Sequence, residues 1–248
     1  MRKLSALVIV AIAGLGAAAP ADAADMPRKR PKVQVIKPIP VPVVIDTVTS
    51  GWYVRADFGH RWYSLSHVVP ATGFTPPTGN NVSSGWFGGI GAGFKQDWLR
   101  VDVTADWGTG VTYTGQAAAG DVTAKFRANT VLLNAYYEPY TWNGFTPYIG
   151  VGAGAAHVTV SGYSSTAIPP FTPVGASKQW NFAYAVMVGS SFAVTRNVLL
   201  DVGYRYLGLG TADTPPDSTG RVAEFKNIAA HELRFGVRFF FPDPVTIR

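Results

Sequence analysis

One pattern constrains the fold of this chain more than any other: apolar and polar side chains alternate with a period of two. Between Leu99 and Trp107, every odd-numbered residue is apolar and every even-numbered residue is charged or threonine. Successive side chains of a strand point to opposite faces, so this period predicts a strand with one apolar and one polar face. The same alternation, or a glycine-rich form of it, recurs over residues 52–59, 85–95, 99–107, 131–138, 148–155, 180–194, 199–206 and 232–241, which predicts eight strands.

The connections between these segments differ in length in a regular way. Three are short, namely "KQD" at 95–97, "PYTWNG" at 139–144 and "TRN" at 195–197. The others, over residues 64–84, 109–121, 163–179 and 208–228, are long and rich in Gly, Pro, Ser and Thr. If neighbouring strands are antiparallel, all long loops emerge at one end, as in transmembrane barrels. We therefore predict an all-β fold, an eight-stranded antiparallel up-and-down transmembrane β-barrel.

The alternative to a membrane barrel is a soluble, lipocalin-like barrel, which would turn its apolar face inward. Charged residues are 15% of this chain, against about 25% in an ordinary soluble domain. The polar face holds mainly Gly, Thr, Asn and charges of both signs, which suits a narrow packed interior. Large aromatic residues stand near the strand ends, where interfacial girdles form. The predicted membrane-interface aromatics are Trp52, Trp86, Trp107, Trp180, Tyr204, Tyr206, Phe239 and Phe241.

The N-terminal region predicts export. Arg2 and Lys3 precede an apolar run, and Ala21-Asp22-Ala23 then offers small residues at a cleavage site, as in signal peptides. A retained membrane helix is the alternative, but the run is shorter than the about 20 residues that span a bilayer. We predict a signal peptide at 1–23, a basic, Pro-rich periplasmic linker at 24–50, the outer-membrane barrel at 51–241 and a periplasmic tail at 242–248. The linker carries no aromatic residues among its charges, which favours a solvated spacer over a nucleic-acid site.

No residue pattern in this chain indicates catalytic chemistry. The chain has no cysteine, and its four histidines lack the spacing of metal ligands. The segments "GIGAGF" (89–94) and "GVGAGAA" (150–156) resemble phosphate-binding loops, but no helix or P-loop lysine follows, so close strand packing explains them better. His157 and Ser161 would stand about 13 Å apart along a strand, too far for a Ser/His pair. We expect no enzyme activity, no catalytic residue, no metal site and no cofactor.

Charged residues on the inward parity of the strands form a candidate network in the lumen. Its predicted members are Arg55, Asp57, Arg100, Asp102, Asp106, Glu138, Asp201, Arg205, Glu232, Arg234 and Arg238. With Arg61 added, six positive charges face six negative ones. Buried charges are costly unless paired, and an eight-stranded lumen is only wide enough for side chains. A salt-bridged plug is therefore favoured over a path for protons or ions.

Four segments carry a resemblance to a known family: "GWYVRADFGHRW", "PYIGVGAGAA", "VTRNVLLDVGYRYLGLG" and "ELRFGVRFFF". With the signal peptide, they resemble the small outer-membrane β-barrel proteins of Gram-negative bacteria, the opacity-type surface antigens, particularly those of alphaproteobacteria. The resemblance covers about residues 50–241 and implies an eight-stranded barrel in the cell outer membrane. It also implies an N terminus facing the periplasm and a role in envelope integrity or surface interaction.

The C-terminus departs from that family. Its members typically end on the aromatic residue that the barrel-assembly machinery recognises, whereas here "PDPVTIR" follows Phe241. Pro242 lacks a backbone donor, so we expect the strand to stop there and the assembly signal to be read internally.

These observations together predict a non-enzymatic integral outer-membrane barrel that contributes to envelope structure and displays surface loops. A narrow porin for small solutes and an adhesin acting through the long loops remain as alternatives. The expected partners are outer-membrane lipid and lipopolysaccharide, the barrel-assembly machinery during biogenesis, and a host or surface ligand at the loops. No nucleic acid is expected.

Overall fold

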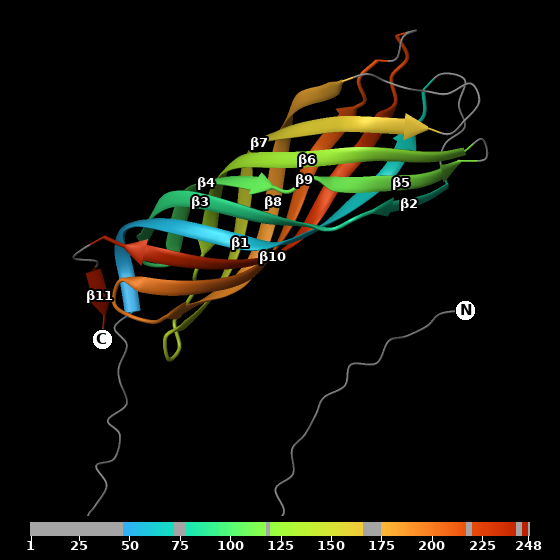
Figure 1. The fold of residues 1–248 in the computed structure, drawn as a ribbon. Helices are drawn as coiled ribbons and strands as arrows, with labels where there is room; N and C mark the ends of the chain where they lie inside the picture. Colours follow the sequence, from blue (N-terminus) through green and yellow to red (C-terminus); the bar gives the residue numbers. More distant parts are fainter. Residues whose placement is uncertain are drawn as a thin grey trace, which may run out of the picture. The chain divides into compact units, whose positions relative to one another are not determined.

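The computed structural model describes residues 47–71, 78–117, 120–165, 175–216, 220–241 and 245–247 (Figure 1). The predicted signal peptide and residues 24–46 of the predicted linker lie outside the described residues. The strands are β1 Thr47–Val69, β2 Thr78–Val82, β3 Gly85–Gln96, β4 Leu99–Gly108, β5 Val111–Ala117, β6 Gly120–Tyr137, β7 Phe145–Ser165, β8 Ala176–Ala193, β9 Val198–Asp213, β10 Glu224–Phe240 and β11 Val245–Ile247. The described residues contain no helix that is long and apolar enough to cross a membrane.

Eight of these strands close into a ring. The hydrogen-bonded order is β1, β3, β4, β6, β7, β8, β9, β10 and back to β1, and every neighbouring pair is antiparallel. β6 pairs with two different strands along its length. β4 pairs with residues 129–137 of β6, and β5 pairs with its outer residues 120–126. β2 pairs with β5 in the same region. The predicted eight-stranded antiparallel barrel is confirmed.

The strands are longer than the sequence pattern suggested. Segments expected as irregular loops hold β2, β5 and the outer parts of β1, β6, β7, β8, β9 and β10, so that expectation was wrong. These segments keep the alternation of a strand, but with the apolar residues on the inward side: Val111 and Tyr113 are buried, and Thr112 and Thr114 between them are exposed. In Figure 1, β2 and β5 lie toward the end of the barrel opposite β11.

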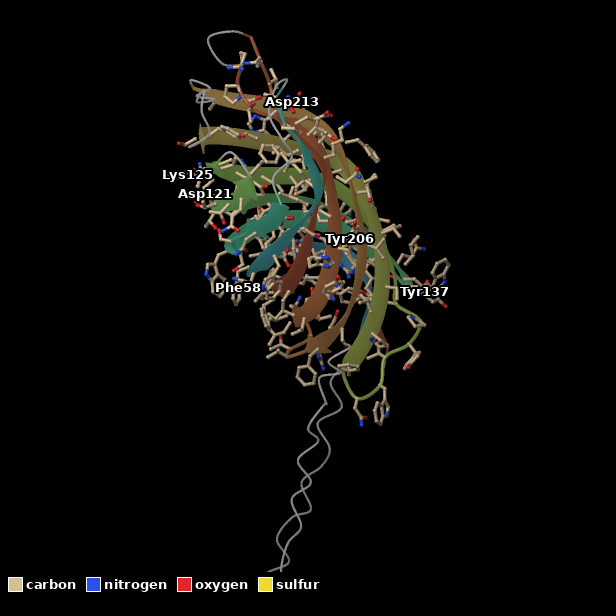
Figure 2. The ribbon with its side chains drawn as sticks, turned by 90° about the vertical axis from the view of Figure 1, so that its right-hand side faces the viewer. Phe58, Asp121, Lys125, Tyr137, Tyr206 and Asp213 are labelled. Carbon is tan, nitrogen blue, oxygen red and sulfur yellow. The ribbon has the colours of Figure 1, made fainter. Side chains whose placement is uncertain are left out.

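Along β6 the polarity of the two faces reverses. Near its C-terminal end Leu133 is exposed and Asn134 is buried, whereas near its N-terminal end Lys125 is exposed and Phe126 is buried. Figure 2 shows Lys125 and Tyr137, both on the outer face of this strand, near its two ends. An apolar outer face suits lipid, and a polar outer face suits water. The reversal therefore marks the level at which the barrel leaves the membrane.

The short turns and the described C-terminal strand lie at the other end. The turns between β3 and β4, between β6 and β7 and between β8 and β9 are the short ones that face the periplasm in such barrels. β10 ends at Phe240, and β11 then pairs antiparallel with Thr47–Ser50 at the start of β1. Val245 and Ile247 are β-branched, which favours a strand. The tail thus contributes a short strand, and β1 begins four residues before Gly51.

Candidate functional site

Apolar and charged side chains share the interior of the barrel. Beside the turn between β8 and β9, a small apolar cluster is formed by Tyr53, Ala193, Leu199 and Phe240. The charged layer starts at the same end of the barrel, at Lys95 and Glu138, and the outer layer beyond it is apolar. Each layer comes from inward positions of strands that are far apart in the chain, which the closed ring brings together.

The structure places every residue of the predicted lumen network inside the barrel. Arg55, Asp57, Arg100, Asp102, Asp106, Glu138, Asp201, Arg205, Glu232, Arg234 and Arg238 are all buried, as is Arg61. One member was missed: Lys95 is also buried and forms an ion pair with Glu138. The sequence did hold an indication of this position, because Lys95 alternates in step with Gly91 and Gly93, which lie on the inward face. The described network therefore has seven cations and six acids.

Asp102 joins several strands at the inner side of the charged layer. Its carboxylate accepts hydrogen bonds from Arg55 Nη1, from Tyr53 Oη and from Asn134 Nδ2, each at 2.8 Å. Arg100 Nη1 lies 3.3 Å from the same carboxylate. Charge-assisted hydrogen bonds of this kind are the strong ones, and together they satisfy the buried acid.

Glu138 is the second acid at this level. Arg100 Nε donates to its Oε1 atom at 2.6 Å, Lys95 pairs with its Oε2 atom, and Arg238 Nη1 lies 3.5 Å away. Arg238 in turn pairs with Asp201 at 2.7 Å. The residue that follows β6 is thereby tied to β3, β4 and β10.

A second group of charges lies nearer the outer end. Arg205 Nε donates to Glu232 at 2.6 Å, and its Nη2 atom donates to Asp106 at 2.7 Å. Arg61 Nε donates to the other oxygen of Glu232 at 2.6 Å. Arg234 lies 3.1 Å from Asp106. Five strands meet in this group, since its residues come from β1, β4, β9 and β10 and the Arg61 guanidinium also donates to a backbone carbonyl of β6.

Asp57 connects the two groups of charges. Arg55 Nη2 lies 2.7 Å from its carboxylate on one side, and Arg234 Nη2 lies 3.3 Å away on the other. Aromatic rings add further contacts to the cations: the Arg100 guanidinium lies 3.5 Å from the centre of the Tyr136 ring. An aromatic face attracts a cation, and more strongly where water is excluded. The charged layer is thus one continuous network.

Inward glycines make room for these long side chains. A Cβ atom on Gly89 would lie 2.0 Å from Asp106 Oδ1, and one on Gly93 would lie 2.5 Å from Asp102 Cβ. Both distances are far below van der Waals contact. The glycine-rich segment 89–94 therefore reflects close packing of β3 against the charged side chains.

The outer layer of the interior is apolar and aromatic. The Phe126 and Phe225 rings lie edge to face with their centres 4.6 Å apart, and Tyr113 packs against Phe225 at 5.4 Å. Burial raises the pKa of the Tyr163 hydroxyl, at the outer end of β7, to about 12. The part of the barrel beyond the membrane thus has a packed apolar core of its own.

The predicted interface aromatics lie on the outer wall. Trp52, Trp86, Trp107, Trp180, Tyr204, Phe239 and Phe241 are exposed, and Tyr206 is partly buried. Three histidines join the outer part of this girdle and contact aromatic rings: His60 against Trp86, His157 against Trp180 and His231 against Tyr204. Figure 2 labels Tyr206 on this wall.

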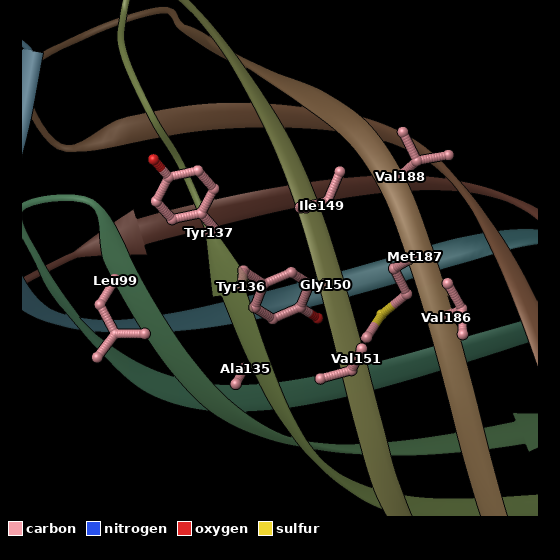
Figure 3. Close-up of a pocket in the computed structure, with 10 residues that line it drawn as sticks. All are labelled: Leu99, Ala135, Tyr136, Tyr137, Ile149, Gly150, Val151, Val186, Met187 and Val188. Carbon is pink, nitrogen blue, oxygen red and sulfur yellow. The ribbon is translucent and has the colours of Figure 1, made fainter.

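The lipid-facing wall between the girdles is uneven. A depression of about 490 Å³ spans β6, β7 and β8 and is lined almost wholly by apolar groups (Figure 3). Gly150, which has no side chain, lies at its base, and Ile149, Val151 and Val188 stand around it. Its apolar lining continues the lipid-facing surface around it.

The described residues hold no cluster of three or more histidines, cysteines and acids placed to bind a metal ion. His157, which the sequence offered as half of a Ser/His pair, lies on the outer face of β7, where its ring centre is 4.9 Å from that of Trp180.

A closed antiparallel ring with an apolar, aromatic-girdled outer wall and a charged interior defines an integral membrane β-barrel protein. The chain belongs to the family described as outer membrane protein beta-barrel domain, whose model matches residues 8–241. This places the protein in the outer membrane of a Gram-negative bacterium, as the sequence predicted.

Individual proteins are similar to this chain over most of its length. An uncharacterized protein of Brucella suis is 26% identical over 241 residues, covering 84% of this chain and 82% of the relative. A putative adhesin of Rickettsia conorii is 29% identical over 210 residues, covering 78% and 83%. Among solved structures, the crystal structure of Neisserial surface protein A is 27% identical with a TM-score of 0.50, covering 77% of this chain and 99% of that one.

Proposed function

We propose that this protein is a non-catalytic outer-membrane barrel with a closed lumen, which supports the envelope and holds a rigid β-sheet extension outside the membrane. The observation that carries the proposal is the continuous network of seven cations and six acids across the lumen. Two apolar clusters pack against that network, with Tyr136 beside Arg100 and Tyr53 beside Arg238. An eight-stranded interior is only wide enough for side chains, and here those side chains are mutually bonded.

Single-channel recording of the purified protein in planar bilayers tests the closed lumen. We expect no discrete conductance steps from the wild type. A variant that removes two network arginines, Arg205→Ala with Arg234→Ala, should give irregular current, because it empties the space around Asp106. A steady channel in the wild type would refute the closed lumen and favour the narrow porin.

Adhesion is the second candidate function. The support is the similarity to the putative adhesin of Rickettsia conorii, together with the outer extension of β2, β5 and β6, whose outward residues are polar. Bacteria that display the wild type should bind host-cell surfaces more than bacteria displaying a chain with Thr112, Thr114 and Thr123 changed to lysine. Equal binding by the two strains would count against adhesion through this sheet.

The proposed partners follow from the position of the barrel in the outer membrane. Outer-membrane lipid and lipopolysaccharide would surround the apolar wall, and the barrel-assembly machinery would insert the chain. A host or surface ligand would meet the extension outside the membrane.

A further inference from the structure

A depression of about 230 Å³ opens on the outer wall between Trp107 of β4 and Trp180 of β8. Asn129 and His157 lie between the two tryptophans, and the four residues form one row across four adjacent strands: Trp107 pairs with Asn129, Asn129 with His157, and His157 with Trp180. The lining is mixed: indole, amide and imidazole groups surround Ala105 and Val131, and Asp106 and Thr130 of the inward face also contribute. Such a row, at the level where the barrel leaves the membrane, combines stacking surfaces with hydrogen-bonding groups.

The rows on either side of this one differ sharply. One step toward the periplasm, Ala105, Val131 and Phe182 lie in a row that is wholly apolar. One step outward, Arg127 and Lys178 flank Thr159, and Lys125 follows one step further along β6. The wall therefore passes from apolar, through aromatic and amide groups, to cationic within a few residues along each strand.

The cations of this wall are exposed and available. Within the described part of the chain, Arg127 and Lys178 form no ion pair, in contrast to the buried cations of the lumen. Lys226, on β10, is partly exposed and lies 3.2 Å from Glu224. Asp121 lies four residues from Lys125 on the same face of β6, at its outer end (Figure 2).

We propose that the wall formed by β4, β6, β7 and β8 binds a phosphorylated, acylated glycolipid of the outer leaflet. Arg127 and Lys178 stand two strands apart, about 10 Å between backbones, so their long side chains can converge on one phosphate group. Guanidinium and ammonium groups are the side chains that bind phosphate best. The sugar lies in the depression, against the two indole rings, with Asn129 and His157 as hydrogen-bonding groups. An acyl chain extends from the sugar toward the periplasm and crosses the apolar row.

The order of cationic, aromatic and apolar groups along the wall favours a phosphorylated glycolipid over other ligands. A soluble anion would use the cations but not the apolar row, and an uncharged lipid would use the apolar row but not the cations. A glycolipid with both a phosphate and acyl chains uses all three levels in the order in which they occur. The inference does not rest on the closed lumen, because the depression lies on the outside of the barrel.

The test uses the full protein purified in detergent and lipid A carrying its phosphates as the probe. Native mass spectrometry measures the fraction of protein with bound lipid as the lipid concentration is raised. We expect the double variant Arg127→Gln, Lys178→Gln to bind at least tenfold more weakly than the wild type, and each single variant to lie between the two. Lys226→Gln, which removes the same charge from another wall, should bind like the wild type. Lipid A without phosphates should bind the wild type as weakly as phosphorylated lipid A binds the double variant.

Three results would overturn the proposal: unchanged binding by the double variant, equal binding of lipid A with and without phosphates, or full displacement of the lipid by a soluble sulfated polysaccharide. The last result would identify the wall as a site for polyanionic glycans. All variants are first checked for the folded form by the mobility difference between boiled and unboiled samples. The single variants keep the test decisive if the double variant fails to fold.

Discussion

Arg55 of β1 and Asp102 of β4 lie 47 residues apart in the chain and meet inside the barrel, with 2.8 Å between Arg55 Nη1 and Asp102 Oδ2. Their strands are not neighbours, because β3 lies between them in the ring. The charged layer therefore connects strands that the backbone ladder does not, and it does so across the lumen.

The Asp102→Ala variant should be markedly less stable than the wild type. It removes the carboxylate shared by Arg55 and Arg100, and leaving a buried charge without its partner costs about 3 to 5 kcal/mol in a dry site, less where water enters. Thermal unfolding in detergent, followed by gel mobility, measures the effect. Asp97→Asn, in the exposed turn between β3 and β4, is the matched control and should unfold like the wild type. Equal unfolding temperatures for the two variants would show that the network contributes little to stability.

Adding one methyl group to β3 should destabilise the barrel on the inward face of the strand and have little effect on the outward face. In Gly93→Ala the new Cβ would lie 2.5 Å from Asp102 Cβ and 2.7 Å from Tyr53 Oη, whereas in Gly88→Ala its nearest neighbour is 3.8 Å away. Overpacking of this kind costs about 1 to 3 kcal/mol. The measurement is the urea concentration that unfolds half of each variant in detergent. We expect a clear decrease for Gly93→Ala and little change for Gly88→Ala; a decrease of equal size in both would contradict the packing account.

Deleting residues 243–248 should leave a barrel that still assembles. The deletion removes β11, but the ring is closed by β10 and β1, from Tyr53 opposite Phe240 onward. Changing both Phe239 and Phe241 to glutamate should prevent assembly, because these exposed rings face lipid, where a charge costs up to about 2 to 4 kcal/mol at the midplane and less near the interface. The amount of folded protein in outer-membrane fractions is the readout. Loss of the truncated chain from those fractions would make the tail part of the assembly signal.

Single cysteines can establish the orientation, since the chain has none of its own. Thr114→Cys, on the outer face of β5, should react with a membrane-impermeant maleimide added to intact cells. Gln96→Cys, beside the turn between β3 and β4, should react only after the outer membrane is opened. Thr114 and Gln96 are both exposed, so the contrast reports sidedness rather than burial. The reverse pattern of labelling would mean that the barrel is inverted.

The sequence was sufficient for the ring and for most of its interior, because period-two alternation fixes both the strand and the face on which each side chain lies. Arg100, Asp102 and Asp106 share one parity within a single strand, and that parity alone predicted their burial. Lys95 was missed because its strand is rich in glycine, which leaves too few side chains to reveal the inward face.

The full lengths of the strands could not be predicted from the same rule. Beyond the membrane the apolar residues of the alternation lie on the inward face, as at Phe126. A search for strands with an apolar outer face therefore does not detect these parts of the strands. The pairing of β11 with β1 was also missed, since a strand of three residues after Pro242 has too short a pattern to detect. Which acid meets which arginine depends on the stagger between strands, which the sequence does not reveal.

The reversal of polarity along β6 also fixes how deep the protein sits in the bilayer. Sinking by one pair of residues, about 7 Å along the strand, would carry Arg127 toward hydrocarbon, and rising by the same amount would expose the apolar row at Val131 to water. Both displacements are opposed by solvation, so the barrel has a single preferred height, and the surface beyond Lys125 stands at a constant distance above the lipid.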